Sequence, residues 1–218
     1  MNMLGMKKGE NPSIVGIVTN PVDQFEKIKQ RPLIICAFVI VLGLTIVGTW
    51  LANSGANITG FEGSIDDTQI GINRAIMLIG SIFGLIFAIF IPSVLYLLIA
   101  KIIQSEVTFR QIVSMNTYIM VISGISMILN GLTIYLIGGN LDTLHTSLGS
   151  LVPSEGVMIG FWSSIEIFTI WITILSAIGL QKVAGFSRLL AWVISIVFFM
   201  IGVLLMVGST AINIMVGV

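Results

Sequence analysis

The sequence predicts an all-α integral membrane protein. We expect a five-helix transmembrane bundle, N-terminus in and C-terminus out, preceded by a short amphipathic interfacial helix. Three observations predict this fold class. Hydrophobic residues make up 56% of the 218 residues and charged residues only 9%, whereas a soluble domain carries roughly 25% charged residues. Five long apolar runs divide the chain, and the basic residues gather on one side of them.

Each apolar run is long enough to cross a bilayer, whose core of about 30 Å needs about 20 residues of helix. The spans are expected at about 33–52, 75–100, 112–137, 157–180 and 189–216, and Glu166 is the one charged residue inside them. We expect helices because lipid offers no partner for an unpaired backbone group. The chain therefore divides into a cytoplasmic segment, 1–32, and a five-span membrane domain, 33–218.

The charges between the runs predict the orientation, because cytoplasmic loops of membrane proteins are enriched in lysine and arginine. With the N-terminus inside, the cytoplasmic segments hold nine basic and four acidic residues, a net charge of +5. The outer loops hold Arg74 and five acidic residues, a net charge of −4. The lipid bilayer is thus the first expected partner. The total charge of zero indicates no other partner, and no nucleic acid is expected.

The residues before the first run predict a short amphipathic helix over 21–31. Its start carries an N-cap residue, a proline at the first helical position and a first-turn carboxylate: Asn20, Pro21 and Asp23. Apolar residues recur on one side, and basic residues lead into the first span, which is typical of a helix at the headgroup level. This helix either anchors the first span or offers a docking surface to a cytoplasmic partner.

Polar residues mark a seam inside the predicted bundle. Asn116, Ser123 and Asn130 are spaced by sevens in the third run and so share one helix face. Glu166 and Thr173 share a face in the fourth run. Polar residues gather at helix interfaces in lipid, so packing is the favoured explanation for the seam.

Small residues on the second run suggest a second interface. Gly80 and Gly84 follow the small-xxx-small pattern, which lets helix backbones approach closely. They serve either self-association or packing within one bundle, so the oligomeric state is left open.

Glu166 is the residue that packing explains least well. A carboxylate inside a span is costly unless it is partnered or protonated. Asn130 lies seven residues before the outer end of its run, at a comparable depth, so we expect Glu166 to hydrogen-bond Asn130 as a protonated acid. A structural contact and a proton-coupled or ion-conducting site both remain open. The structural contact is favoured, because the spans hold no basic residue or second acid to relay a proton.

The sequence lacks the motifs of several catalytic and metal-binding sites. It contains neither the phosphate loop G-x-x-x-x-G-K-[ST] nor the zinc motif H-E-x-x-H. The one histidine, His145, has Asp142 as its nearest acid, and a catalytic zinc usually takes three protein ligands. We therefore predict no catalytic, cofactor-binding or metal-binding residues and expect that the protein is not an enzyme.

Three stretches of the chain resemble the Yip family of membrane proteins. The first is Asn20-Pro21 with Phe25, Ile28 and Pro32, directly before the first span. The second is Thr108-Phe109-Arg110-Gln111, followed by Ser114 and Tyr118. The third is Glu166-x-Phe168-x-Ile170-Trp171, followed by Leu175 and Ile178-Gly179-Leu180. The matches are spread from about residue 20 to 180, which covers most of the chain.

The resemblance implies a five-span bundle with no known catalytic activity. Eukaryotic members of the family interact with Rab-type GTPases in vesicle traffic and usually have a longer cytoplasmic N-terminal domain. This chain has 32 residues before the first run, and so it is more similar to the bacterial branch. Members of that branch accompany ABC-type exporters and assist their assembly or toxin resistance. The bacterial plasma membrane is therefore the expected location.

We expect a non-enzymatic membrane scaffold, an accessory subunit that assists assembly of an ABC-type exporter or resistance to a toxic peptide. The residues expected to contact a membrane-protein partner are Phe25, Ile28, Gly80, Gly84 and Trp171. Two alternatives remain open at this point. One is a small proton-linked transporter or channel that uses Glu166. The other is a trafficking factor that binds small GTPases, if the source is eukaryotic.

Overall fold

The computed structural model describes residues 10–55, 67–138 and 144–216, and in these residues the chain is helical with no strand. The α-helices are α1 (Ile14–Thr19), α2 (Pro21–Gln30), α3 (Ile35–Gly55), α4 (Asp67–Ile102), α5 (Phe109–Ile137), α6 (Met158–Ser164), α7 (Ile167–Lys182) and α8 (Arg188–Val216). A short 3-10 helix, η1 (Leu148–Ser150), precedes α6. The all-helical class is confirmed for this part of the chain. Five of the charged residues used to predict the orientation lie outside it: Lys7, Lys8, Glu62, Asp66 and Asp142.

In the described part of the chain, four helices are long and apolar enough to cross a membrane. They cover Ile35–Gly55, Ile70–Ile102, Phe109–Ile137 and Arg188–Val216. The apolar helix α7 has only 16 residues, so it is about 24 Å long at 1.5 Å per residue. That is shorter than a bilayer core of about 30 Å. The protein is therefore a multi-pass membrane protein with four candidate spans that are single helices.

The predicted fourth span, 157–180, is not one continuous helix. α6 ends at Ser164 and α7 begins at Ile167, with extended backbone at Glu166 (φ −120°, ψ 146°). The hydropathy of a run averages over about 20 residues and so does not detect a two-residue interruption. The freed backbone groups find partners inside the protein: the Ile165 carbonyl accepts from Leu148 N–H at 2.9 Å. A broken helix is tolerated at membrane depth where its backbone is paired in this way.

The closest helix packing joins α3 to α5. A Cβ added to Gly48 would lie 2.7 Å from the carbonyl carbon of Met127, and one on Gly131 would overlap the Gly48 carbonyl oxygen. Glycine allows this approach because it has no side chain. The sequence left Gly80 and Gly84 on α4 open to self-association or to packing within the bundle, and in the structure a Cβ at either position would meet nothing within 4 Å. The glycine face of α4 is therefore open in this chain.

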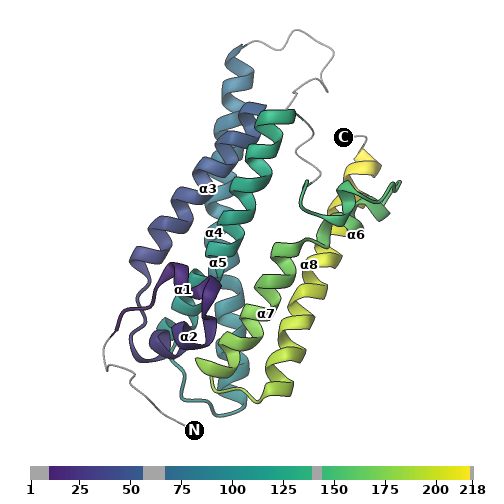
Figure 1. Cartoon of the computed structure of the whole chain (residues 1–218). Helices are drawn as coiled ribbons and strands as arrows, with labels where there is room; N and C mark the ends of the chain where they lie inside the picture. Colours follow the sequence, from purple (N-terminus) through teal and green to yellow (C-terminus); the bar gives the residue numbers. More distant parts are fainter. Residues whose placement is uncertain (1–9, 56–66, 139–143, 217–218) are drawn as a thin grey trace.

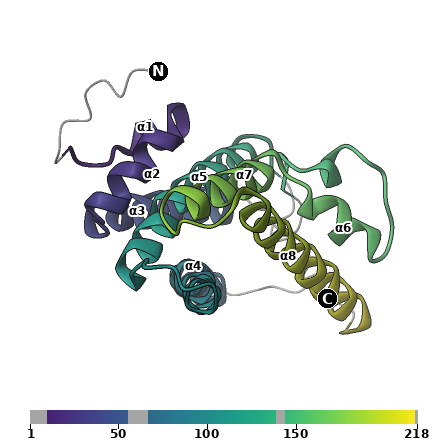
Figure 2. The same cartoon turned by 90° about the horizontal axis from the view of Figure 1, so that it is seen from below.

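The helices form two groups that separate on one side. α3, α4 and α5 lie together, and α6 and α7 lie against α8, with α5 and α7 in contact between the groups (Figure 1). α4 and α8 meet at Tyr96 and Phe198, whose ring centroids are 4.7 Å apart. Beyond that contact α8 leans away from α4 (Figure 2).

α1 and α2 lie against one end of the bundle, which we call the α2 end. Phe25 and Ile28 are fully buried in the main hydrophobic cluster, together with residues of α5 and α7. Lys182 Nζ lies 2.9 Å from Glu26 Oε1 and so ties α2 to the end of α7. The predicted helix over 21–31 thus exists as α2. However, the apolar residues expected as partner contacts face the core, so a partner would have to displace α2 to reach them.

Ion pairs also join the turns of this N-terminal segment. The Lys27 ammonium lies 3.0 Å from Glu10 Oε2 and 3.0 Å from Asp23 Oδ2. These hydrogen bonds, first the one to Glu10, raise the pKa of Lys27 above its ordinary value of 10.5. Lys27 is therefore cationic throughout the physiological pH range.

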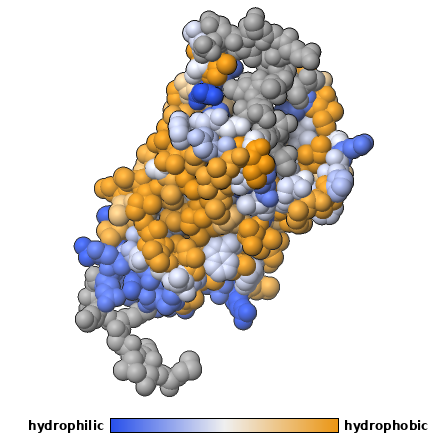
Figure 3. Space-filling view, turned by 45° about the horizontal axis from the view of Figure 1, so that its top comes forward, coloured by the Kyte–Doolittle hydropathy of each residue, from blue (hydrophilic) through white to orange (hydrophobic). Residues whose placement is uncertain are grey.

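The surface has the distribution expected of a membrane protein. Hydrophobic residues cover the middle of the face shown in Figure 3, and hydrophilic residues gather at the α2 end. Large apolar side chains are exposed on α4 and α8, including Phe83, Phe87, Leu204 and Leu205. A monomeric soluble protein rarely exposes so extensive an apolar surface, so we assign these side chains to lipid or to a membrane partner.

Candidate functional site

Glu166 lies at the break between α6 and α7, at the N-cap position of α7. Its backbone N–H donates to Thr169 Oγ1 at 3.1 Å, and the two residues form a reciprocal capping box. A carboxylate at the start of a helix also faces the positive end of the helix dipole. The sequence Glu166-x-x-Thr169 therefore starts a new helix inside an apolar run. The side chain of Glu166 is only 4% exposed.

Three side-chain donors converge on Glu166 Oε1. The Thr146 hydroxyl donates at 2.5 Å, Asn130 Nδ2 donates at 3.2 Å, and the Ser126 hydroxyl donates as well. No lysine or arginine forms an ion pair with Glu166 in the described part of the chain. The carboxyl group is thus held by neutral donors, which satisfy a buried acceptor without a counter-ion.

Asn130 connects the elements around Glu166. Its Oδ1 accepts from Thr146 N–H at 3.1 Å, and its Nδ2 donates to Thr146 Oγ1 at 2.8 Å. Asn130 therefore joins α5, the segment before η1 and the start of α7. We call Ser126, Asn130, Thr146 and Glu166 the polar latch. All but Thr146 are buried.

The contact expected between Asn130 and Glu166 is present, but the sequence did not identify the other two members of the latch. Ser126 lies one helical turn before Asn130, and the spacing by sevens passed over it. Thr146 lies in a connection whose position depends on the tertiary fold. A search for hydroxyl residues at spacing four from Asn130 would have found Ser126.

The predicted seam is not continuous along α5. Asn116 forms a separate contact, because its Nδ2 donates to Ser93 Oγ of α4 at 2.7 Å. Ser123, midway between Asn116 and Asn130, is partly exposed and has no hydrogen bond among the described residues. Thr173 donates to the Thr169 carbonyl of its own helix at 2.8 Å. One face of α5 meets different elements along its length, so equal spacing did not produce one network.

The residues expected to contact a partner differ in their exposure in the structure. Gly80 and Gly84 are exposed on α4. Trp171 is partly buried and packs against the main hydrophobic cluster. Phe25 and Ile28 are internal, as described above. The glycine face of α4 is therefore the part of this set that remains accessible.

The site offers few groups for metal or covalent chemistry. No cluster of three or more histidine, cysteine, aspartate or glutamate side chains suited to a metal occurs in the residues that the structure describes. His145 Nδ1 is buried without a hydrogen-bond partner in this part of the chain, and Asp142, its nearest acid in sequence, lies outside it. The latch thus provides one carboxyl group and three neutral donors, an arrangement suited to holding a broken helix in place.

Comparison with known proteins identifies the family. The Yip1 domain matches residues 15–209, a range that includes α2 and the polar latch. The chain is also similar to "Membrane protein YknW" of Bacillus subtilis (strain 168), with 32% identity over 213 residues, 94% of this chain and 92% of the relative. No solved structure matches. The resemblance seen in the sequence is confirmed: this chain belongs to the Yip1-domain family of membrane proteins.

Proposed function

We propose that this protein is a non-enzymatic scaffold of the bacterial plasma membrane: an accessory subunit that packs against a membrane complex and assists assembly of an ABC-type exporter or resistance to a toxic peptide. The open glycine face of α4 is the observation that carries this proposal. Family membership supports a membrane role without catalysis, and the Bacillus relative supports a bacterial location. The Bacillus relative also favours a protein of the bacterial branch over the alternative of a trafficking factor that binds GTPases.

The proposal includes five crossings, with the N-terminus in the cytoplasm. α1 and α2 lie at the opposite end of the bundle from the C-terminal end of α8 (Figure 1), as an odd number of crossings requires. α6 and α7 together then supply the crossing that no single helix makes between α5 and α8. Lys101, Lys182 and Arg188 share the α2 end with the basic residues of α2, which agrees with a cytoplasmic location for that end.

α4 has the properties of a docking helix. Gly80 and Gly84 are exposed, and nothing lies within 4 Å of the position of their missing Cβ atoms. Phe83 and Phe87 flank them and are 56% and 57% exposed. Small residues allow close backbone approach, and association in lipid depends on the van der Waals packing that follows. A transmembrane helix of the exporter's membrane subunit fits this surface.

The test is co-purification of the exporter's membrane subunit with this protein in a mild detergent. Leucine at Gly84 should remove most of the bound subunit, because its side chain would hold the partner helix away. Gly43 on α3 is a matched control, since it is also exposed and has nothing within 4 Å of its Cβ position. The same recovery with Gly84→Leu as with Gly43→Leu would refute docking on α4. Loss of a homodimer with unchanged recovery would assign the face to self-association.

Glu166 supports a second candidate, a small proton-linked transporter or channel. The observation in its favour is a carboxyl that is 4% exposed and has no ion-pair partner in the described residues. A transporter should carry protons across liposomes as a purified protein, and Glu166→Gln should abolish that flux. A scaffold should show no flux, and its Glu166→Gln variant should still bind the exporter. Normal folding and binding with Glu166→Leu as well would make the carboxyl dispensable.

A further inference from the structure

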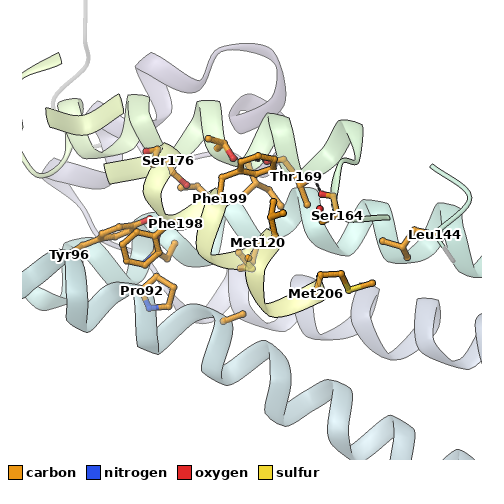
Figure 4. Close-up of a pocket in the computed structure, with 18 of the residues that line it drawn as sticks. Pro92, Tyr96, Met120, Leu144, Ser164, Thr169, Ser176, Phe198, Phe199 and Met206 are labelled. Atoms are coloured by element: carbon orange, nitrogen blue, oxygen red, sulfur yellow. Dashed lines mark hydrogen bonds between the residues drawn. The ribbon is translucent and has the colours of Figure 1, made fainter. Parts of the chain in front are cut away.

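A cavity of about 350 Å³ lies between α4, α5, α7 and α8. Its walls include Pro92 and Tyr96 of α4, Met120 of α5, and Phe198, Phe199 and Met206 of α8 (Figure 4). The lining is mostly apolar with a few polar groups, and the volume lies in the range of small-molecule sites. Glu166 is not part of its lining, but Thr169, whose hydroxyl accepts from the Glu166 N–H, is.

One polar group in this lining has an unused acceptor. Asn116 is 4% exposed and lines the cavity. Ser93 Oγ donates its proton to the Ile89 carbonyl at 2.6 Å, so it can only accept from Asn116 Nδ2 at 2.7 Å. This fixes the orientation of the amide and leaves Asn116 Oδ1 without a donor among the described residues. Because Asn116 lines the cavity, this oxygen can accept a hydrogen bond from a donor inside it.

A second polar group lies near the same end of the cavity. Ser195 is 2% exposed and lines the cavity, and its hydroxyl has no partner in the described part of the chain. Ser195 is one turn from Phe198, and Ser93 is one turn from Tyr96, the two rings that join α8 and α4. Asn116 and Ser195 each lie seven residues into their helices, about 10 Å from the α2 end. This end of the cavity therefore offers both an acceptor and a hydroxyl.

Among the residues that the structure describes, the lining contains no aspartate, glutamate, lysine, arginine or histidine. A charged headgroup or an ion would lose its hydration there without a compensating partner, which is strongly unfavourable. A ligand of this cavity therefore has an uncharged polar group. An alcohol beside an ester suits Asn116 and Ser195, because the alcohol donates to Asn116 Oδ1 and an ester oxygen accepts from the Ser195 hydroxyl. The Ser163 hydroxyl of α6 also lines the cavity without a partner among the described residues.

The shape of the cavity fits a lipid chain that enters from the side. Ala88 of α4 and Gly202 of α8 both line it and are both exposed, so the opening lies between these two helices. α4 and α8 diverge along their length (Figure 2). The stretch of α8 from Ser195 to Met206 lines the cavity over about 16 Å at 1.5 Å per residue. One leaflet of a bilayer core is about 15 Å thick. Because the opening faces the side of the bundle, membrane lipid is the molecule that reaches it.

We propose that this cavity binds a neutral, hydroxyl-bearing lipid of the acylglycerol class. The lipid hydroxyl donates to Asn116 Oδ1, and one acyl chain lies along Phe198, Phe199 and Met206. This inference does not depend on the docking of α4 against an exporter, because the cavity does not include Gly80 or Gly84.

The test uses monooleoylglycerol with a photoreactive diazirine in its chain, added to the purified full-length protein in detergent. Labelling is measured by intact mass, and the labelled peptides are mapped. We expect saturable labelling of α8 around Phe198 to Met206 that unlabelled monooleoylglycerol displaces. Oleate at pH 9, which is anionic, should compete about tenfold less well, because the cavity offers its charge no partner.

Two variants and one control locate the site. Asn116→Leu removes the acceptor and should reduce labelling about fivefold or more, given the usual cost of a lost buried hydrogen bond. Gly202→Leu fills the opening and should do the same, and it should fold because nothing lies within 4 Å of its Cβ position. Gly43→Leu, on a distant exposed face, should label as the unmodified protein does.

Three results would overturn the proposal. They are unchanged labelling in Gly202→Leu, equal competition by oleate, and labels spread over the outer faces of all the helices. If unchanged labelling in Gly202→Leu came together with reduced exporter recovery, the cavity would be assigned to a side chain of the partner. Gly84→Leu should label normally even where it loses the exporter, so the two proposals fail separately.

Discussion

Replacing Gly48 by alanine tests the close packing of α3 on α5. The added Cβ would lie 2.7 Å and 2.8 Å from the backbone carbonyl carbon and oxygen of Met127. Both atoms belong to the backbone of α5, so no side-chain rotation relieves the overlap. The two helices must separate, or α3 must shift along α5. Gly43→Ala is the matched control, because Gly43 is on the same helix and has nothing within 4 Å of its Cβ position.

The size of the effect follows from the difference between these variants. Alanine in place of glycine within a helix gains about 0.5–1 kcal/mol of stability from backbone propensity alone. Both variants share this gain, so it cancels in the comparison. Inserting a methyl group into a well-packed contact costs about 1–3 kcal/mol. Gly48→Ala should therefore be less stable than Gly43→Ala by about that amount.

The assay is equilibrium unfolding in mixed micelles of dodecyl maltoside and sodium dodecyl sulfate, followed by helix circular dichroism and tryptophan fluorescence. We expect Gly43→Ala at or slightly above the stability of the unmodified protein and Gly48→Ala clearly below it. Equal free energies of unfolding for the two variants would mean that α3 and α5 do not approach through Gly48.

Three further perturbations address the polar latch and the N-terminal segment. Asn130→Leu removes the three hydrogen bonds that join Asn130 to Thr146 and Glu166. Because such a bond contributes about 0.6 kcal/mol in a membrane protein, the free energy of unfolding should fall by about 2 kcal/mol in the same assay. Phe25→Ala should cost about 3–5 kcal/mol, as for other fully buried phenylalanines, and a neutral result would mean that α2 does not dock on the bundle. The raised pKa of Lys27 predicts stabilisation that is complete below pH 10.5 and is lost as pH rises through the higher folded-state pKa. Lys27→Met should remove this loss, so its free energy of unfolding should fall less between pH 9 and pH 11 than that of the unmodified protein.

Patterns within single segments were enough to predict most of the fold. The apolar runs at about 33–52, 75–100, 112–137 and 189–216 all correspond to long helices, because length and hydropathy are local properties. α2 could be predicted from its caps and amphipathic spacing, since Asn20 Oδ1 does accept from Asp23 N–H, at 3.5 Å. The contact between Asn130 and Glu166 could be predicted because the two residues lie at similar depths in their predicted spans.

The errors share one cause, which is that each depended on what an element packs against. The break at Glu166 depends on Leu148 and Thr146, which reach it from a separate connection. Glycine spacing does not distinguish a packed face from an open one. The spacing left Gly80 and Gly84 open to packing within the bundle or to self-association, and the structure has its close glycine packing between Gly48 and Gly131.

The sequence by itself determined that this chain is a helical, multi-pass membrane protein with one buried carboxyl, because the bilayer limits backbone to paired helices and makes charge costly. Only the tertiary structure decided the rest. It buried the apolar side of α2, gathered the polar latch around a helix break, left the glycine face of α4 open, and formed a cavity lined by Asn116 and Ser195. These features depend on contacts between residues far apart in the chain, which periodicity within one segment does not encode.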